Sequence, residues 1–330
     1  GINSGPHSRM RYDQYHDFDA FAESIRDVDA RMVLVNPQRH LWTSSALQLQ
    51  DINLQMGWLG SGNLAQAGLR NDFYLFYLPT TPGIEYKANG IVLQRNTFAV
   101  VKPGSEFCIA TKDPHDWFGA FVPKELLGPL PDDMANSRSP SCWMSRTDHQ
   151  AASRFRTLVS QVMKMATTCS DFESTAAAKV AAKEVIEIAK SAFEQPVIDR
   201  NHRGGRPKVP REQVIGTCMD FIEQCTDTHI QVSELARTAD VSERTIRSAF
   251  NEYFGVGPIR YLYLRRLQGI HRDLDTSEPD GTSVSKVLAD HGEWDFGRFA
   301  SNYRQLFGEL PSETRRRKKS AATPCKTQPA

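Results

Sequence analysis

The sequence has none of the short motifs that carry common enzyme chemistry. It contains no Gly-x-Ser-x-Gly motif, no phosphate-binding loop and no glycine-rich dinucleotide fingerprint. Its six cysteines are scattered, without a CxxC pair or zinc-finger spacing, so we expect buried or free thiols and no metal. No apolar run approaches the roughly 18 residues of a membrane span. These absences argue against an enzyme and against a membrane protein.

The net charge of +1 gives no indication of a nucleic-acid partner. Its distribution is more informative, because two short basic clusters lie in the C-terminal half of the chain. Arg203, Arg206 and Lys208 occupy a glycine-containing stretch, and residues 315–319 are all basic. Such runs are usually solvated, and they become meaningful only beside a DNA-binding unit, where they would attract phosphate without reading sequence.

Changes in pattern divide the 330 residues into successive regions. They are a polar segment at 1–30, a strand-rich sensor region at 31–147, a helical hairpin for dimerisation or linkage at 148–200, a basic linker at 201–209, a helical DNA-binding region at 210–317 and a tail at 318–330. The fold class expected is multidomain α+β, with an N-terminal β-barrel or sandwich, a helical hairpin and an all-α C-terminal domain.

The region 31–147 alternates short apolar runs with glycine, proline and asparagine, a pattern typical of a sandwich or barrel. The runs lie at 73–78, 91–93, 98–101, 107–110 and 117–122. Before this region, residues 18–27 are compatible with a short helix.

Residues 148–195 predict two helices, because apolar side chains recur at helical spacing. The apolar stripe of the first helix comprises Phe155, Leu158, Val162 and Met165. Either a dimer seam or the barrel would bury this stripe, and we expect the dimer seam.

Residues 230–255 have the pattern of a helix-turn-helix unit. A short helix with Leu235 inside is followed by a tight turn, after which Ser242 is placed to cap a second helix at 243–253. The second helix would turn Ile246 and Phe250 inward and leave a basic face outside, as a recognition helix does.

The same pattern recurs farther along the chain. A short helix starting at Ser283 precedes a turn at 291–295 and a second recognition helix at 296–307. Both units end in an aromatic residue, a glycine and a proline three residues later, at a spacing of 53 residues. One helix at 261–274 connects the two units.

Residues 209–317 resemble the AraC/XylS family of bacterial transcription regulators. The resemblance is carried by Leu235-Ala236, Val241-Ser242, Arg244-Thr245, Phe250, Phe254-Gly255, Pro258, Tyr261-Leu262, Leu267, Gly297-Arg298-Phe299, Tyr303-Arg304, Leu306-Phe307-Gly308 and Pro311-Ser312. It implies two helix-turn-helix units joined by a rigid helix. Glu293 departs from the family, which has a large apolar residue there, so Trp294 or Phe296 would have to fill the gap.

The resemblance also implies which side chains face DNA. In the first recognition helix the candidates are Ser242, Glu243, Arg244, Arg247, Ser248 and Asn251, and in the second they are Phe296, Gly297, Arg298, Ser301 and Arg304. For Arg265, Arg266 and Arg304, phosphate contact and plain solvation are equally open.

The N-terminal region carries a weaker resemblance. Residues 89–104 are similar to a cupin hairpin, but His40 and His115 stand alone, so the cupin metal set is absent. The whole chain is similar to the ethanolamine-utilization regulator group, which would imply ethanolamine and adenosylcobalamin as effectors. Because sensor domains change ligand faster than fold, we expect an unknown small-molecule effector and no cofactor. The candidate pocket residues, which could equally fill the core, are Phe73, Tyr74, Phe76, Phe107 and Trp117.

Together these features predict a cytoplasmic, sequence-specific transcription regulator that responds to an effector. The expected partners are duplex DNA, RNA polymerase and a second copy of the chain, without a membrane. The alternative is an architectural or repair protein that uses the same helical units. A repair methyl acceptor would need a reactive cysteine cluster near the N-terminus, and the first cysteine is Cys108.

Overall fold

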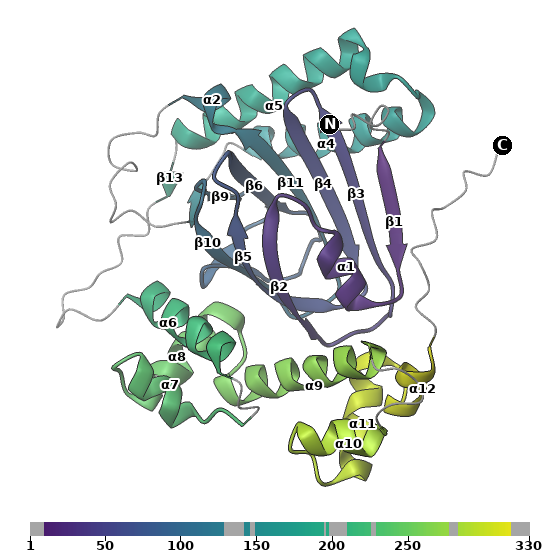
Figure 1. Cartoon of the computed structure of the whole chain (residues 1–330). Helices are drawn as coiled ribbons and strands as arrows, with labels where there is room; N and C mark the ends of the chain where they lie inside the picture. Colours follow the sequence, from purple (N-terminus) through teal and green to yellow (C-terminus); the bar gives the residue numbers. More distant parts are fainter. Residues whose placement is uncertain are drawn as a thin grey trace, which may run out of the picture.

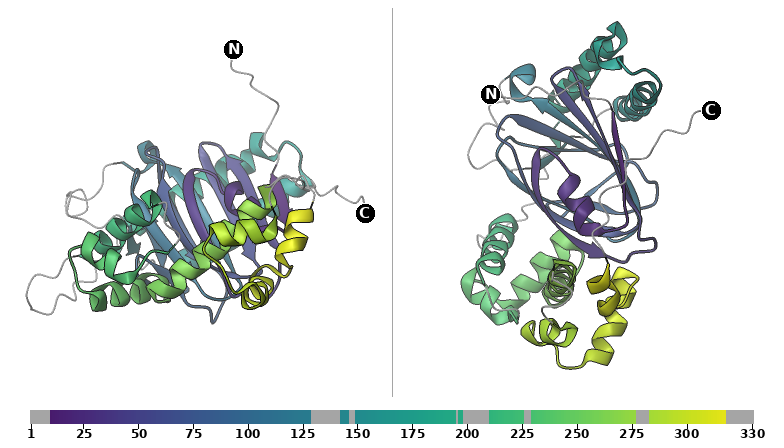
Figure 2. Two further views of the ribbon diagram at one scale, coloured as in Figure 1. Left: turned by 60° about the horizontal axis from the view of Figure 1, so that its bottom comes forward. Right: turned by 45° about the vertical axis from the view of Figure 1, so that its right-hand side comes forward.

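A computed structural model describes residues 10–128, 142–145, 149–194, 196–197, 210–225, 229–276 and 283–317. A β-rich region occupies the centre, with two long helices at one end and the C-terminal helices at the other (Figures 1 and 2). Within the described ranges, no helix is both long and apolar enough to span a membrane. The basic linker at 201–209 and the tail at 318–330 lie outside the described residues.

Two antiparallel sheets form the β-rich region, as the alternating sequence pattern predicts. The larger sheet has the order β1-β3-β4-β11-β6-β9-β12-β13 and the smaller has the order β2-β5-β10-β7-β8. The strands of the larger sheet are β1 (Arg11–Tyr15), β3 (Trp42–Leu49), β4 (Ile52–Leu59), β11 (His115–Pro123), β6 (Phe73–Pro79), β9 (Phe98–Val101), β12 (Cys142–Ser145) and β13 (Pro196–Val197). Those of the smaller sheet are β2 (Val28–Val35), β5 (Gly62–Leu69), β10 (Glu106–Thr111), β7 (Tyr86–Ala88) and β8 (Ile91–Leu93).

Strand β6 is buried on both faces, which explains its continuous run of aromatic and leucine side chains. Successive side chains of a strand point to opposite faces. Tyr77 therefore stacks on Trp117 in the core between the sheets, with ring centroids 5.9 Å apart, whereas Tyr74 and Phe76 contact Phe193 on the opposite face. A strand that alternated with solvent would instead show polar residues at every second position.

The structure does not bring the five candidate effector residues into one pocket. Tyr74 and Phe76 belong to the core beneath the long helices. Phe107 and Trp117 belong to the core that the sheets share with the C-terminal region, and Phe73 packs against that second core. The expectation of a common aromatic pocket fails because β6 sends alternate rings to different sides of its sheet.

The two long helices are α4 (His149–Thr168) and α5 (Ala176–Glu194), connected through a 3₁₀ turn at Phe172–Ser174. Their apolar faces cover the outer face of the larger sheet, where Phe155 meets Phe98 with ring centroids 5.2 Å apart. Phe155 and Val162 are buried there, Leu158 is partly buried, and Met165 is 44% exposed. The sheet, rather than the expected dimer seam, therefore buries most of this stripe.

Short helices complete the N-terminal half, and seven helices form the described C-terminal region. The former are α1 (Phe18–Ser24) and α2 (Lys124–Leu127). The latter are α6 (Arg211–Gln224), α7 (Val232–Thr238), α8 (Glu243–Phe254), α9 (Pro258–Thr276), α10 (Val284–Asp290), α11 (Phe296–Phe307) and α12 (Pro311–Arg316).

Local sequence signals set the ends of these helices. The hydroxyl of Ser242 accepts a hydrogen bond from the Thr245 amide at 3.2 Å and so caps α8, as predicted. Gly255 and Gly308 end α8 and α11 with left-handed backbones, at φ values of 66° and 76°, which glycine adopts at little cost. Helix α7 begins at Val232, and Gln231 caps it.

We predict that Phe155→Ala lowers the free energy of unfolding by about 3–5 kcal/mol, because it opens a cavity between α4 and the sheet. Met165→Ala on the same helix is the matched control and should cost less than about 1 kcal/mol, since that side chain is largely exposed. Chemical denaturation followed by circular dichroism measures both. Equal losses in the two variants would contradict the burial of this helix face.

Candidate DNA-binding interface

The first helix-turn-helix unit is built from α7, a tight turn and α8. Leu235 of α7 and Ile246 and Phe250 of α8 are buried against each other and against the rest of the C-terminal core. Asp240 in the turn has a left-handed backbone, with φ of 50°, a conformation that aspartate tolerates better than most residues. This inward packing fixes which face of α8 remains outside.

The outer face of α8 carries the charged and polar side chains predicted for it. Ser242, Glu243, Arg244, Arg247, Ser248 and Asn251 are all exposed. Arg247 forms a 2.8 Å ion pair with Glu243, one helical turn away. Because an exposed pair of this kind contributes at most about 1 kcal/mol, a stronger anionic partner can take the guanidinium from Glu243.

Arg211 joins this face, although the sequence reading did not select it. Its guanidinium donates to the Ser248 hydroxyl at 3.2 Å and lies 3.4 Å from the carboxylate of Glu252. Arg211 is the first residue of α6, after Pro210, and only the packing of α6 on α8 places it here. The structure therefore gives the first recognition helix an additional cation from another helix.

The second unit, α10 to α11, repeats this construction. Asp295 caps α11 by accepting from the Arg298 amide at 3.1 Å, while Phe299, Tyr303 and Leu306 face the core. The predicted outer residues Phe296, Gly297, Arg298, Ser301 and Arg304 are exposed. In α10, Val287 and Leu288 are buried, whereas Ala289 is exposed.

The turn of the second unit is stabilised by an ion pair rather than by an apolar contact. Glu293 meets Arg266 of α9 at 2.9 Å, and both side chains are mostly buried. Neither Trp294, at 86% exposed, nor Phe296, at 40%, fills the gap as the sequence comparison suggested. The polar pair replaces the apolar packing that the family resemblance implies.

For three arginines, Arg265, Arg266 and Arg304, the sequence left phosphate contact and solvation equally open. The structure shows what two of them contact. Arg266 is held by Glu293, and the guanidinium of Arg265 donates to the Ile222 carbonyl at 2.8 Å. Both therefore serve contacts within the C-terminal region. Arg304 remains exposed on α11 and retains both possibilities.

Helix α9 holds the two units at a fixed separation. Near its start, Tyr261 stacks on Phe254 of the first unit, with ring centroids 4.9 Å apart. Near its end, His271 stacks on Phe307 of the second unit at 4.3 Å. Its 19 residues correspond to a rod of about 28 Å. Because both ends are packed, the recognition helices cannot move independently.

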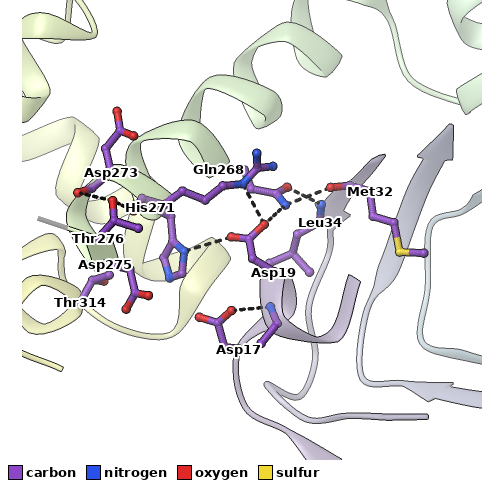
Figure 3. Close-up of polar contacts among 12 residues, drawn as sticks. Asp17, Asp19, Met32, Leu34, Gln268, His271, Asp273, Asp275, Thr276 and Thr314 are labelled. Carbon is purple, nitrogen blue, oxygen red and sulfur yellow. Dashed lines mark hydrogen bonds and ion pairs between the residues drawn. The ribbon is translucent and has the colours of Figure 1, made fainter. Parts of the chain in front are cut away.

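Helix α9 also docks on the edge of the smaller sheet. Strand β2 is the first strand of that sheet, so its outward amides and carbonyls have no partner strand among the described residues. Gln268 supplies the missing partners, since its oxygen accepts from the Leu34 amide at 3.2 Å and its nitrogen donates to the Met32 carbonyl at 2.9 Å. The same nitrogen lies 2.7 Å from Asp19 of α1 (Figure 3). One buried amide thus continues the sheet into the DNA-binding region.

His271 lies one turn farther along α9, between two carboxylates. One ring nitrogen lies 3.4 Å from Asp19 (Figure 3). The other lies 3.6 Å from Glu309, which follows α11. Burial disfavours the charged imidazole, but these two carboxylates outweigh it and raise the pKa of His271 to about 9. Burial likewise opposes charge on Asp19 and Glu309, yet the contact with His271 lowers the pKa of each. The cluster therefore contains a charged histidine at neutral pH.

Arginines close the cluster from two sides. Arg272 lies 3.0 Å from Asp19, and Arg317 lies 2.7 Å from Asp17 and 3.2 Å from Glu309. The β-rich region, α9 and the end of the second unit are therefore joined by alternating charges. His271 is central to this network, because its removal would take one cationic partner from both Asp19 and Glu309.

The first unit touches the β-rich region as well. Lys87 of β7 donates to the Asn251 carbonyl of α8 at 3.4 Å, and the side chain of Lys112 lies against Gly255. Both units are thus attached to the same two-sheet body, on the side opposite α4 and α5 (Figure 2).

Comparison with known proteins agrees with this geometry. Residues 235–317 match the family described as "Helix-turn-helix domain". The C-terminal region is an AraC-type helix-turn-helix domain. The XylDLEGF operon transcriptional activator 1 of Pseudomonas putida is 32% identical over 142 residues, which is 43% of this chain and 40% of that protein. A second XylDLEGF operon transcriptional activator from P. putida is 27% identical over 258 residues, covering 66% and 77% of the two chains.

Solved structures give matches to the same type of protein. The AraC-like transcriptional activator CuxR aligns over 80% of this chain and 96% of its own, with 12% identity and a TM-score of 0.39. A probable AraC family regulator from Rhodopseudomonas palustris CGA009 is 31% identical, covering 31% of this chain and 94% of its own at a TM-score of 0.28. These matches do not confirm the resemblance to the ethanolamine-utilization regulator group. The AraC-type domain is therefore assigned from its sequence match and its own geometry.

We predict that docking of the AraC-type domain depends on pH through His271. The folded pKa of about 9 lies above the ordinary 6.5, so the stabilisation is fully present below pH 6.5 and is lost as pH rises through 9. The shift corresponds to on the order of 3 kcal/mol. The stability difference between the wild type and His271→Gln, measured by chemical denaturation from pH 6 to 10, should shrink over this range. A constant difference would contradict a charged His271.

Proposed function

We propose that the chain is a transcription regulator that binds duplex DNA with α8 and α11 in successive major-groove segments. One observation carries this proposal. Helix α9 holds two capped helices, α8 and α11, and the polar face of each is exposed. Arg244 and Arg247 of α8 and Arg298 of α11 would face base edges, while Arg304 would contact phosphate. The names of the relatives, which are operon activators, support the same function.

Regulation by an effector is the second part of the proposal. The contact of Gln268 and His271 with Asp19 and β2 supports it, because a ligand that displaced β2 or α1 would act on the helix that carries both units. The effector is an unidentified small molecule, and no cofactor or catalytic role is proposed. Promoter binding would place the protein in the cytoplasm, with RNA polymerase as a partner.

We also propose that the chain forms a homodimer, as expected for such a regulator. Exposed apolar side chains of the helical hairpin support this, since Met165 of α4 and Val180 of α5 are 44% and 66% exposed. The wild-type mass in light scattering over a range of concentrations tests the dimer, and a monomer at every concentration would remove it.

The alternative is an architectural or repair protein, which would bind DNA without regulating transcription. The two readings differ in sequence preference. A regulator selects a defined operator from a random library, whereas an architectural protein retains most sequences with similar affinity.

We predict that Arg247→Ala and Arg304→Ala have different effects on DNA binding. A guanidinium at position 247 can donate two hydrogen bonds to guanine, worth roughly 1–3 kcal/mol of discrimination, so its loss should relax preference at one or two base pairs. Loss of a phosphate contact at Arg304 should weaken binding to all sequences about equally and reduce the salt slope by about one.

Selection from a random duplex library at two salt concentrations separates these effects, using the full chain and both variants. A uniform loss of affinity in Arg247→Ala, with an unchanged preference profile, would show that α8 is not placed in the groove as proposed. A wild-type chain that is folded but binds no duplex at low salt would remove the DNA-binding function.

A further inference from the structure

The two recognition helices present different chemistry at equivalent positions. Gly308 ends α11 as Gly255 ends α8, 53 positions earlier (308 − 255), so the two helices align without a gap. Where α8 has Glu243, Arg244 and Arg247, α11 has Phe296, Gly297 and Ala300. We call these three residues of α11 the apolar edge.

The fold does not require the apolar edge. Phe296 is 40% exposed, and the Glu293–Arg266 pair rather than Phe296 fills the second turn. A Cβ added at Gly297 would meet only the Asp295 carboxylate, at 3.8 Å, so space does not demand glycine. Trp294, 86% exposed just before the capping residue, extends the apolar surface. Large exposed aromatics grouped in this way mark interaction sites more often than isolated ones do.

The surroundings of the apolar edge favour duplex DNA as its occupant. Arg298 and Arg304 are exposed on the same helix, and its capped N-terminus carries the positive end of the helix dipole. The apolar edge also occupies the positions of α11 that correspond to exposed positions of α8, and α9 holds both helices. A protein partner would need an apolar surface that also accommodates this positive charge. In duplex DNA, the phosphates on both sides of a groove supply the complementary negative charge.

Only one feature of the major groove offers an apolar contact. The C5-methyl group of thymine projects into the groove, and phenylalanine and alanine side chains pack against it. The arginines at the equivalent positions of α8 would instead favour guanine. We propose, on the basis of the DNA-binding function proposed above, that α11 reads thymines through the apolar edge, so that the operator is asymmetric, with guanine under α8 and thymine under α11.

Replacing thymine by deoxyuridine in the selected operator tests this directly, because it removes the methyl group and leaves every hydrogen-bonding group in place. Each methyl in contact with the apolar edge should cost about fourfold in affinity of the full chain when it is removed. The base pairs whose preference changes in Arg247→Ala identify the half-site under α8, where deoxyuridine should have no effect.

Phe296→Ala should bind the thymine operator about fourfold more weakly and should no longer distinguish thymine from deoxyuridine at one position. Gln305→Ala, an exposed position near the other end of α11, is the matched control and should retain the distinction. Gly297→Arg, which installs the residue that α8 has at the equivalent position, should shift the selected base from thymine to guanine.

The outcomes separate this inference from the function on which it rests. Sequence-specific binding that is undiminished by deoxyuridine at every position, or a thymine preference that persists in Phe296→Ala, overturns the inference alone. Loss of transcription activation in Phe296→Ala with unchanged DNA affinity would assign the apolar edge to a protein partner and overturn it as well. Absence of any DNA binding removes the proposed function itself.

Discussion

The contact between Gln268 and the edge of β2 is the interaction on which the arrangement of the whole chain depends. An edge strand exposes a row of amides and carbonyls that must be satisfied, and at Leu34 and Met32 a side chain of the DNA-binding region does this. Leaving one buried group of this kind unsatisfied costs roughly 1–3 kcal/mol. The charged cluster around His271 adds to the contact from the next turn of the same helix.

Helix α9 therefore contacts both the helix-turn-helix units and the β-rich region. Tyr261 and His271 make the aromatic contacts that hold the two helix-turn-helix units. Gln268 and His271 also bond to the β-rich region. The units cannot be reoriented relative to each other without disturbing α9, and α9 cannot leave the sheet without exposing β2. This shared helix gives the proposed effector response a physical route, since the sensor region and both recognition helices act on one element.

Local features of the C-terminal region could be predicted from the sequence because they depend on neighbouring residues. Ser242 caps α8, Gly255 and Gly308 end their helices, and the 3.6-residue spacing places Ile246 and Phe250 inside. The AraC-type assignment followed from the same residues.

Contacts between distant segments could not be predicted in this way. Nothing local indicates that Arg211 reaches Ser248, that Glu293 pairs with Arg266, or that Gln268 meets β2. The aromatic run of β6 shows a related limit. Its composition predicted a strand of a sandwich or barrel, but only the positions of the second sheet and of α5 decide which ring faces which side.

The spacing of the two half-sites tests the central claim most directly, because a rigid α9 fixes the distance between the recognition helices. Five base pairs inserted between the half-sites of the selected operator would rotate one half-site by about half a helical turn. The account predicts that affinity then falls to that of a single half-site, and that ten inserted base pairs do not restore it. Undiminished binding to either spaced operator would contradict it.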